Sequence, residues 1–377
     1  MNVHASSARA TSADRPPRAI VLGTGARESV RQAAEQLRPQ LDAHLEVVLV
    51  DLEGQHDLST VSADLALVLG GDGSILRAAT QMGDHQIPVI GVNLGKLGFL
   101  ADLSPAELVS VLPDIARGQY RVVDHLMLTC QVVSQGQVLA ECLGLNEVAV
   151  LGGPPYSMLE VDLYVDSEWV TTYSCDGLII STPVGSTAHS LSAGGPILRK
   201  SLQAFVISPV SPHALTMRPV VDMADRQYEL VVREPHAQTS VVVDGRPLRT
   251  LTRADRVLVR RATPQFQLVE VAGRGYYRTL REKLGWGGQS PGRKRNSTGG
   301  GERPLSSDCA DFGILTKTGA RKQPHADAIT TRAVDRCTNH GGQSSFALRY
   351  DWFASDDWFQ SIGFGGGDGA GRGTHQG

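Results

Sequence analysis

The chain has 377 residues, 41% of them hydrophobic, which predicts two to three domains with sizeable cores. Its net charge of -3 gives no global basic field for nucleic acid or a membrane surface, and no stretch approaches the roughly 20 consecutive apolar residues of a membrane span. Five cysteines without a CxxC pair favour free thiols in a cytoplasmic protein over a disulfide framework or a zinc site.

The N-terminal part alternates between strand and helix signals. Residues 1–17 are polar, lack the apolar segment of a secretory signal, and are expected to form a disordered leader. Short apolar runs that predict buried strands occupy residues 19–23, 45–50, 66–69 and 88–93. Helical spacing between them favours an α/β domain with a parallel, doubly wound sheet over residues 18–121. The turn after the first strand lacks the third glycine of a dinucleotide fingerprint, because Glu28 stands there, and no Rossmann site is predicted.

A glycine-rich turn after the third strand carries an unusual carboxylate. The sequence Gly70-Gly71-Asp72-Gly73 predicts a tight turn and a helix start, where glycine backbone and helix N–H groups suit phosphate oxygens. A site that only held phosphate would gain nothing from Asp72. We therefore interpret this residue as a general base or a metal ligand, with an ordinary helix N-cap as the alternative. The same four letters at residues 366–369 lack a strand and a helix pattern and are assigned no chemistry.

A second glycine-containing loop follows the fourth strand, which ends at Asn93. Ligands of parallel sheets collect at the carboxyl ends of the strands, so Asn93 is expected near Asp72. Phe99 in this loop either offers a flat face on which a base stacks or fills the core after the turn. Residues 104–118 then carry the capping and stop signals of one helix.

After Tyr120 the pattern changes to short alternating runs. The runs that predict strands occupy residues 126–133, 138–143, 147–151, 159–165, 228–232, 240–243 and 256–259. They favour an antiparallel, sandwich-like, β-rich domain over residues 122–273. Residues 274–286 predict a closing helix that packs back on the α/β domain. Residues 287–377 are expected to be mostly disordered, and the aromatic patch at 350–359 is interpreted as a docking motif or, preferably, an incidental extension.

A second polar constellation lies in the β-rich part. Residues 176–197 combine hydroxyl side chains with glycines, which offers a polar ligand many short donors and little bulk. Upstream, Asn146 and Glu147 place an amide and a carboxylate together at a strand start. A carboxylate can accept two ribose hydroxyls, and an amide can read an adenine edge.

Together, in this order, these motifs resemble those of the NAD kinases. The resemblance covers about residues 18–286 and rests on residues 70–73, 93–95, 98–99, 146–147, 176–178, 183–188 and 280–286. The glycine turn alone is shared with phosphofructokinases and lipid kinases. The resemblance implies an enzyme that phosphorylates the 2′-hydroxyl of the adenosine ribose of NAD. ATP, or polyphosphate in some members, is the donor, with Mg²⁺ or another divalent cation.

The resemblance also implies roles for individual residues. Asp72 is expected to be the catalytic base, and no residue is assigned as a metal ligand. The residues expected to contact substrates are Asp72, Gly73, Arg77, Phe99, Asn146, Glu147, Asp176, Thr187, Ala188, His189, Ser190, Leu191 and Ser192. Gly73 and Arg77 are expected near phosphates, and Phe99 against adenine. Because the family forms dimers and tetramers, a homodimer or homotetramer is expected, and contacts with the dinucleotide can cross a subunit boundary.

Two positions depart from the family pattern. His189 stands where the family usually has tyrosine, and Ser174 stands where many bacterial members have a basic residue. Both departures bear on NAD affinity. The alternatives are another kinase of the same superfamily, acting on a sugar phosphate or lipid, or a non-catalytic nucleotide-binding regulator. Neither explains both Asp72 and the second constellation. The absence of a Walker A pattern disfavours a P-loop enzyme.

Overall fold

The computed structural model describes residues 15–95, 98–154, 157–271 and 276–286. Most of the predicted leader, the predicted tail at 287–377, its aromatic patch and the second GGDG copy lie outside the described residues. Within the described part, no helix is long and apolar enough to cross a membrane. Its cysteines, Cys130, Cys142 and Cys175, are free thiols.

The N-terminal half is built on four parallel strands in the order β2-β1-β3-β4. These strands are β1 (Arg18–Gly23), β2 (Glu46–Asp51), β3 (Leu65–Gly70) and β4 (Val89–Asn93). The helices between them are α1 (Glu28–Asp42), α2 (Asp72–Met82) and α3 (Pro105–Ala116), with a short 3₁₀ helix at Leu58–Thr60. The predicted α/β domain is confirmed, including the helix start at Ser104, whose side chain and that of Glu107 form a capping box.

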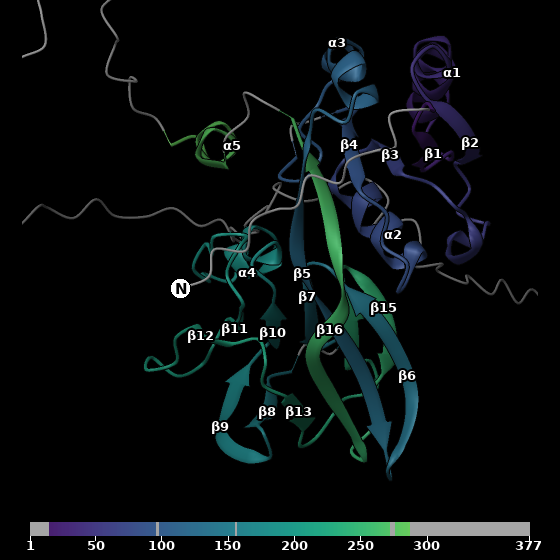
Figure 1. Ribbon diagram of the computed structural model, residues 1–377. Helices are drawn as coiled ribbons and strands as arrows, with labels where there is room; N and C mark the ends of the chain where they lie inside the picture. Colours follow the sequence, from purple (N-terminus) through teal and green to yellow (C-terminus); the bar gives the residue numbers. More distant parts are fainter. Residues whose placement is uncertain (1–14, 96–97, 155–156, 272–275, 287–377) are drawn as a thin grey trace, which may run out of the picture. The chain divides into compact units, whose positions relative to one another are not determined.

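Helices cover both faces of this parallel sheet (Figure 1). Successive strand residues point to opposite faces, so neighbours in β1 belong to different cores. Val21 packs in the cluster that contains the apolar residues of α1 and α3, whereas Ile20 packs in the cluster that contains those of α2. The sheet is therefore doubly wound, as predicted, and α2 lies on the side that meets the β-rich half.

The sheet does not stop at β4. Strand β16 (Asp255–Glu270) pairs in parallel with β4 through Leu268 and Val89, and pairs antiparallel with β5 (Arg121–Ser134) along most of its length (Figure 1). The same ten-stranded sheet continues through β13 (Tyr228–Val232), β8 (Leu159–Val165) and β9 (Glu168–Cys175), while β6 (Gln137–Gly144) pairs with β5. The two halves thus share one continuous sheet.

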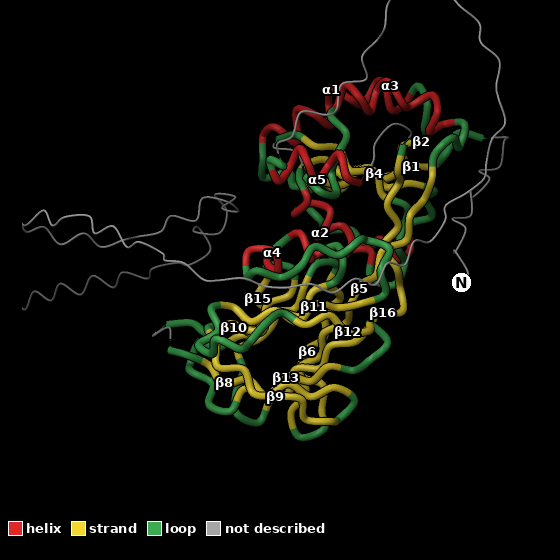
Figure 2. The backbone as a smooth tube through the Cα atoms, turned by 90° about the vertical axis from the view of Figure 1, so that its left-hand side faces the viewer, coloured by secondary structure: helices red, strands yellow, loops and turns green. Residues whose placement is uncertain are grey.

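A second, antiparallel sheet of six strands completes the β-rich half. Its order is β12 (Val220–Met223), β11 (Ala204–Val210), β10 (Gly177–Ser181), β7 (Glu147–Leu151), β14 (Ser240–Val243) and β15 (Arg246–Thr250). In Figure 2, β10 and β11 of this sheet are drawn above β8, β9 and β13 of the first. One buried cluster contains inward residues of both sheets, such as Val148 and Ile180 from the second and Leu163 and Leu230 from the first. The predicted sandwich is confirmed.

The closing helix α5 (Tyr276–Leu284) is observed inside the predicted range of 274–286, whose first two residues lie outside the described part. The Lys283 ammonium lies 5.0 Å from the centroid of the Phe99 ring, a cation–π contact that joins α5 to the loop after β4. The division of the chain at residues 121 and 122 stays a prediction.

Candidate active site

Asp72 is the first residue of α2 and follows directly from the buried strand β3. Gly70 adopts a φ of 140°, a backbone conformation that side chains other than hydrogen disfavour, so the glycine permits the sharp turn. The N-cap is Gly71, and no side chain caps the helix start. The alternative role for Asp72 as an ordinary N-cap is therefore excluded by the geometry.

Backbone N–H groups of the loop after β4 hold the Asp72 carboxylate. Oδ2 accepts from the Phe99 N–H at 2.7 Å, and Oδ1 accepts from the N–H groups of Leu100 and Ala101, both at 3.0 Å. A β-carbon added at Gly98 would lie only 2.0 Å from Oδ1, so only glycine lets the loop wrap this closely. A carboxylate has about four acceptor positions, so one on Oδ2 has no donor among the described residues.

Open space lies in front of the helix start. A β-carbon added at Gly71 or Gly73 would meet no atom of the described residues within 4 Å. The unpaired N–H groups of the first turn and the helix dipole favour an anion at such a place. The turn can therefore receive a phosphate group next to the fixed carboxylate.

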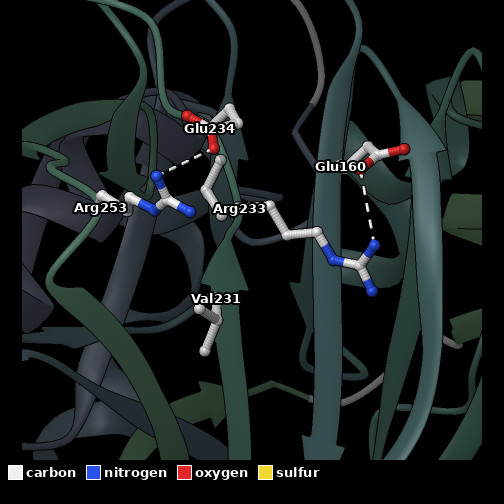
Figure 3. A pocket seen from close by; sticks show the side chains of 6 residues that line it. Glu160, Val231, Arg233, Glu234 and Arg253 are labelled. Carbon is white, nitrogen blue, oxygen red and sulfur yellow. Dashed lines mark ion pairs between the residues drawn. The ribbon is translucent and has the colours of Figure 1, made fainter.

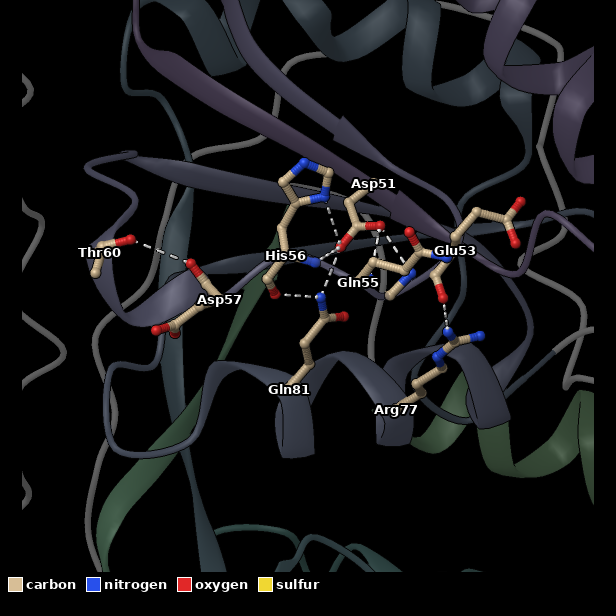
Figure 4. A network of polar contacts seen from close by, with 9 residues as sticks. Asp51, Glu53, Gln55, His56, Asp57, Thr60, Arg77 and Gln81 are labelled. Carbon is tan, nitrogen blue, oxygen red and sulfur yellow. Dashed lines mark hydrogen bonds and ion pairs between the residues drawn. The ribbon is translucent and has the colours of Figure 1, made fainter.

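Arg77, one turn further along α2, is tied to the loop after β2. Its guanidinium donates to the carbonyl of Glu53 (Figure 4). The same loop closes around the buried carboxylate of Asp51, which accepts from the N–H groups of Gly54 at 2.7 Å and His56 at 3.0 Å. These and further hydrogen bonds outweigh burial and hold the pKa of Asp51 well below its usual range. A phosphate contact by Arg77 would have to coexist with, or replace, its bond to this loop.

Asn146 and Glu147 lie at the start of β7 and are positioned by a residue that the sequence patterns did not single out. The Asp244 carboxylate, in the turn between β14 and β15, accepts from the N–H groups of Leu145, Asn146 and Glu147 at 2.7, 2.8 and 3.0 Å. The Asn146 carbonyl accepts from the Thr182 N–H at 2.8 Å. This contact joins the start of β7 to the polar stretch after β10.

The Glu147 carboxyl is almost fully buried. Burial raises the pKa of this carboxyl to about 8, with a smaller contribution from the nearby Asp244 carboxylate. Glu147 is therefore mostly uncharged at neutral pH. The His189 N–H donates to this carboxyl, while Oε2 has no hydrogen-bond partner within the described residues. A buried polar atom without a partner is rare and favours a ligand group at this point.

The turn that follows β10 carries Thr187, Ala188, His189, Ser190, Leu191 and Ser192, and the N–H of His189 reaches the Glu147 carboxyl. Two of its hydroxyls are used internally, because Thr187 donates to the Val184 carbonyl at 2.9 Å and Ser190 shares a 3.0 Å bond with Ser208. His189 is half-buried, and burial lowers its pKa, so its imidazole is neutral at physiological pH. The side chains that a ligand can reach are therefore those of His189 and its half-buried or exposed neighbours, not Thr187 or Ser190.

Asp176 does not join the other predicted residues. Strands β7 and β10 run antiparallel, with Ser181 opposite Glu147 and Gly177 opposite Leu151. Asp176 therefore lies beyond the far end of the strand pair, about 17 Å along the strand from Glu147 at roughly 3.4 Å per residue. Its exposed carboxylate lies 3.4 Å from the imidazole of His213.

The rest of the described surface offers no second site. Among the residues that the structure describes, no group of three or more His, Cys, Asp or Glu side chains could hold a metal ion. A hollow between β8, β13 and the turn before β16 is lined by Arg233 and Arg253 (Figure 3). These arginines pair with Glu160 at 3.6 Å and with Glu234 at 3.2 Å. Its charges are already neutralised, and no chemistry is assigned to it.

Comparison with known proteins identifies the family. Residues 22–120 match the ATP-NAD kinase N-terminal domain, and residues 145–271 match the ATP-NAD kinase C-terminal domain. The chain is 53% identical over 275 residues to an NAD kinase of Rhodopirellula baltica, which covers 73% of this chain and 88% of the relative. The chain belongs to the NAD kinase family. It is thus an enzyme, a kinase acting on NAD.

Further relatives of this NAD kinase agree. An NAD kinase of Heliobacterium modesticaldum is 43% identical over 221 residues, covering 59% of this chain and 78% of the relative. A solved NAD kinase from Archaeoglobus fulgidus in complex with ATP is 27% identical, with a TM-score of 0.58 and coverage of 72% and 100% of the two chains. A yeast NADH kinase complexed with NADH, 22% identical with a TM-score of 0.64 and coverage of 72% and 89%, shares the fold.

The NAD kinase motifs predicted Asp72 and Glu147 but missed the groups that hold them. These groups are the loop N–H donors of residues 99–101, Asp244, and Lys200, whose ammonium donates to the Phe99 carbonyl at 2.8 Å. Asp244 precedes Gly245, and this pair lies between two strand-like runs. An Asp-Gly pair in such a place is a hairpin signal, so the sequence does predict a turn at Asp244. Lys200 offered no such signal.

Proposed function

We propose that this NAD kinase transfers the terminal phosphate of ATP, or of polyphosphate, to the 2′-hydroxyl of the adenosine ribose of NAD, with Asp72 as the general base. The observation that carries the proposal is the Asp72 carboxylate, oriented by three backbone N–H groups and left with one open acceptor position beside the uncapped start of α2. A pure binding site for phosphate would not gain from such a carboxylate.

The reaction balances without a covalent enzyme intermediate. The 2′-oxygen of NAD forms a bond to the terminal phosphorus while the bond from that phosphorus to the bridging oxygen breaks, and the electron pair of that bond leaves with ADP or with the shortened polyphosphate. Asp72 accepts the hydroxyl proton as the new bond forms. Most of the rate enhancement comes from positioning and from cancelling phosphate charge, to which the N–H groups around Gly73 contribute.

We propose that the divalent metal ion binds to the phosphate donor rather than to a preformed site in the protein. The described residues form no cluster of metal ligands, and all but one acceptor position of Asp72 is taken by backbone N–H groups. Mg²⁺ is commonly bound through substrate phosphates and one or two carboxylates rather than by a protein cage, and it would neutralise phosphate charge. We therefore place it on the phosphate chain of ATP or polyphosphate.

The NAD site is proposed to span both polar constellations. Glu147, uncharged and with Oε2 unpartnered within the described part, would bond a ribose hydroxyl, and Asn146 would hold the adenosine end. Phe99, half-buried, would stack on adenine and share its ring with Lys283. His189 and its exposed neighbours would line the dinucleotide.

Asp176 is proposed to serve the site of a neighbouring subunit in a homodimer or homotetramer. Its exposed position at the far end of β7 and β10 supports this role, because within one chain it cannot reach Glu147. The free thiols Cys130, Cys142 and Cys175 support the cytoplasm, a reducing compartment, as the place of action.

Replacement of Asp72 by asparagine tests the proposed function. Formation of NADP from NAD, Mg²⁺ and either ATP or polyphosphate is measured for the wild type, Asp72→Asn and, as a control, Asp84→Asn. Asp84 is exposed and lies just beyond the other end of α2. We expect Asp72→Asn to lower kcat roughly a hundredfold or more, because the amide cannot accept the proton, and Asp84→Asn to keep wild-type activity.

The outcomes separate the alternatives. A wild type that makes no NADP with either donor contradicts the proposal. An Asp72→Asn variant with near wild-type kcat contradicts the general-base role alone. The ratio of rates with ATP and with polyphosphate identifies the preferred donor.

A further inference from the structure

Lys200 connects the β-rich half to the carboxylate proposed as the base. It lies between α4 (His189–Ser192) and β11, 101 residues from Phe99 in sequence. Its ammonium donates to the Phe99 carbonyl at 2.8 Å, and the N–H of the same residue, Phe99, donates to Oδ2 of Asp72 at 2.7 Å. Two hydrogen bonds through one residue therefore separate Lys200 from Asp72.

The surroundings of Lys200 favour a fixed position for its charge. Burial lowers the pKa of Lys200. The charges of three carboxylates, those of Asp72, Asp102 and Glu270, act in the opposite direction and stabilise the ammonium. Burial and the Lys200 charge together lower the pKa of His125, the other titratable group beside it, to about 3, so that this imidazole stays neutral. Lys200 is thus a buried cation that bonds the backbone of this loop from the β-rich half, whereas the Lys283 ammonium of α5 lies over the Phe99 ring.

The effect on Asp72 follows from backbone connectivity. The N–H groups of Phe99, Leu100 and Ala101 all bond the Asp72 carboxylate. Lys200 bonds the carbonyl of the peptide unit between Phe99 and Leu100, whose N–H donates to Oδ1 of Asp72. Without that anchor, the loop can shift and take the carboxylate with it. A shift of about 1 Å at a reacting group is enough to lower a rate about a hundredfold.

We infer that Lys200 is a positioning residue for Asp72. Lys200 acts through the Phe99 backbone and makes the orientation of the base depend on the packing of the two halves. The inference rests on the proposed function of Asp72. Lys200 itself is not required to touch either substrate. It is therefore expected to affect kcat more than the KM for NAD, which changes only as far as the Phe99 ring moves with the loop.

Three variants test this role. Lys200→Met removes the ammonium and keeps most of the aliphatic stem, Lys200→Arg keeps a cation, and Arg199→Met removes one positive charge from the exposed neighbouring residue. We expect kcat for NADP formation to fall roughly tenfold to a hundredfold in Lys200→Met, with the KM for NAD changed less than about threefold. Lys200→Arg should recover at least part of kcat, and Arg199→Met should match the wild type.

Hydrogen exchange of the Leu100 and Ala101 N–H groups gives a readout that does not depend on activity. Exchange should be roughly tenfold faster in Lys200→Met than in the wild type or Arg199→Met, because the loop loses its anchor. If the wild type forms no NADP, the proposed function fails, and exchange alone then decides whether Lys200 holds the loop. Three results would overturn the inference. The first is an unchanged kcat in Lys200→Met, and the second is an equal loss of kcat in Arg199→Met. The third is a loss of activity in Lys200→Met that is explained by a lower melting temperature or by a higher KM for NAD.

Discussion

At the scale of single residues, the Glu147 carboxyl links the proposed NAD site to the pH dependence of stability. Its pKa is raised from 4.5 to about 8, chiefly by burial. The folded protein therefore keeps this proton over a pH range in which the unfolded chain releases it, and stability falls as pH rises between these values. The loss amounts to roughly 1.4 kcal/mol for each unit of the pKa shift.

Glu147→Gln should remove this pH dependence, because the amide is uncharged at every pH. We expect the melting temperatures of wild type and variant, both without NAD, to be similar near pH 5 and to separate in favour of the variant by pH 9. Thermal unfolding across this range measures the gap. Curves that stay parallel would show that Glu147 is ionised in the folded protein at neutral pH, contrary to the burial argument.

The same scale shows what sequence motifs can predict. Asp72 and Glu147 stand in short motifs whose residue types suit the chemistry, and the structure places each beside backbone groups that orient it. Lys200 and Asp244 act on those motifs from positions 101 and 97 residues away in the chain. A local pattern carries no information about such a partner, because the contact exists only after the sheets have assembled.

At the scale of elements, the loop after β4 is predicted to be as important to the reaction as the helix that carries Asp72. A β-carbon at Gly98 would lie 2.0 Å from Oδ1 of Asp72 and 3.1 Å from the Ala101 carbonyl, so Gly98→Ala must displace the loop or the carboxylate. We expect kcat to fall roughly tenfold or more. Because the added methyl is small and the strain is local, thermal stability should change much less than activity.

Gly95→Ala in the same loop is the matched comparison. A β-carbon there would meet no atom within 4 Å in the part of the chain that the structure describes, so the loss of activity should be clearly smaller than in Gly98→Ala. Steady-state kinetics and melting temperatures of both variants, measured together, decide the matter. Equal losses in the two variants would contradict the steric argument and point to a general need for loop flexibility.

Elements were predictable where their apolar pattern was regular. Strands β1 to β4 were found, whereas β9, β10, β11, β12 and β15 were not among the predicted strands. Several of the missed strands show why: β12 and β15 are largely exposed edge strands, and β11 contains Pro209, which weakens a strand signal. Only residues 256–259 of β16 were predicted, because Arg260 and Arg261 interrupt the alternation just before a register shift.

At the scale of the whole described unit, composition and pattern predicted two domain types but not how they join. The parallel pairing of β16 with β4 returns the chain to a strand that ended more than 150 residues earlier, and no local pattern specifies that return. One buried cluster contains Ile75 of α2 together with Met127 of β5 and Phe266 of β16. The α/β half and the β-rich half therefore complete one hydrophobic core, which favours cooperative unfolding.

Phe266→Ala tests this coupling. The ring is fully buried in the shared cluster, and its removal should cost about 3–5 kcal/mol. Because the cluster belongs to both halves, amides of β3 and of β10 should lose hydrogen-exchange protection at the same, lower denaturant concentration. Phe205→Ala is the second variant, because the Phe205 ring is fully buried in the sandwich core alone. If the halves are coupled, Phe205→Ala also lowers the hydrogen-exchange protection of β3. A loss of protection confined to β10 would show that the continuous sheet joins two units that unfold independently.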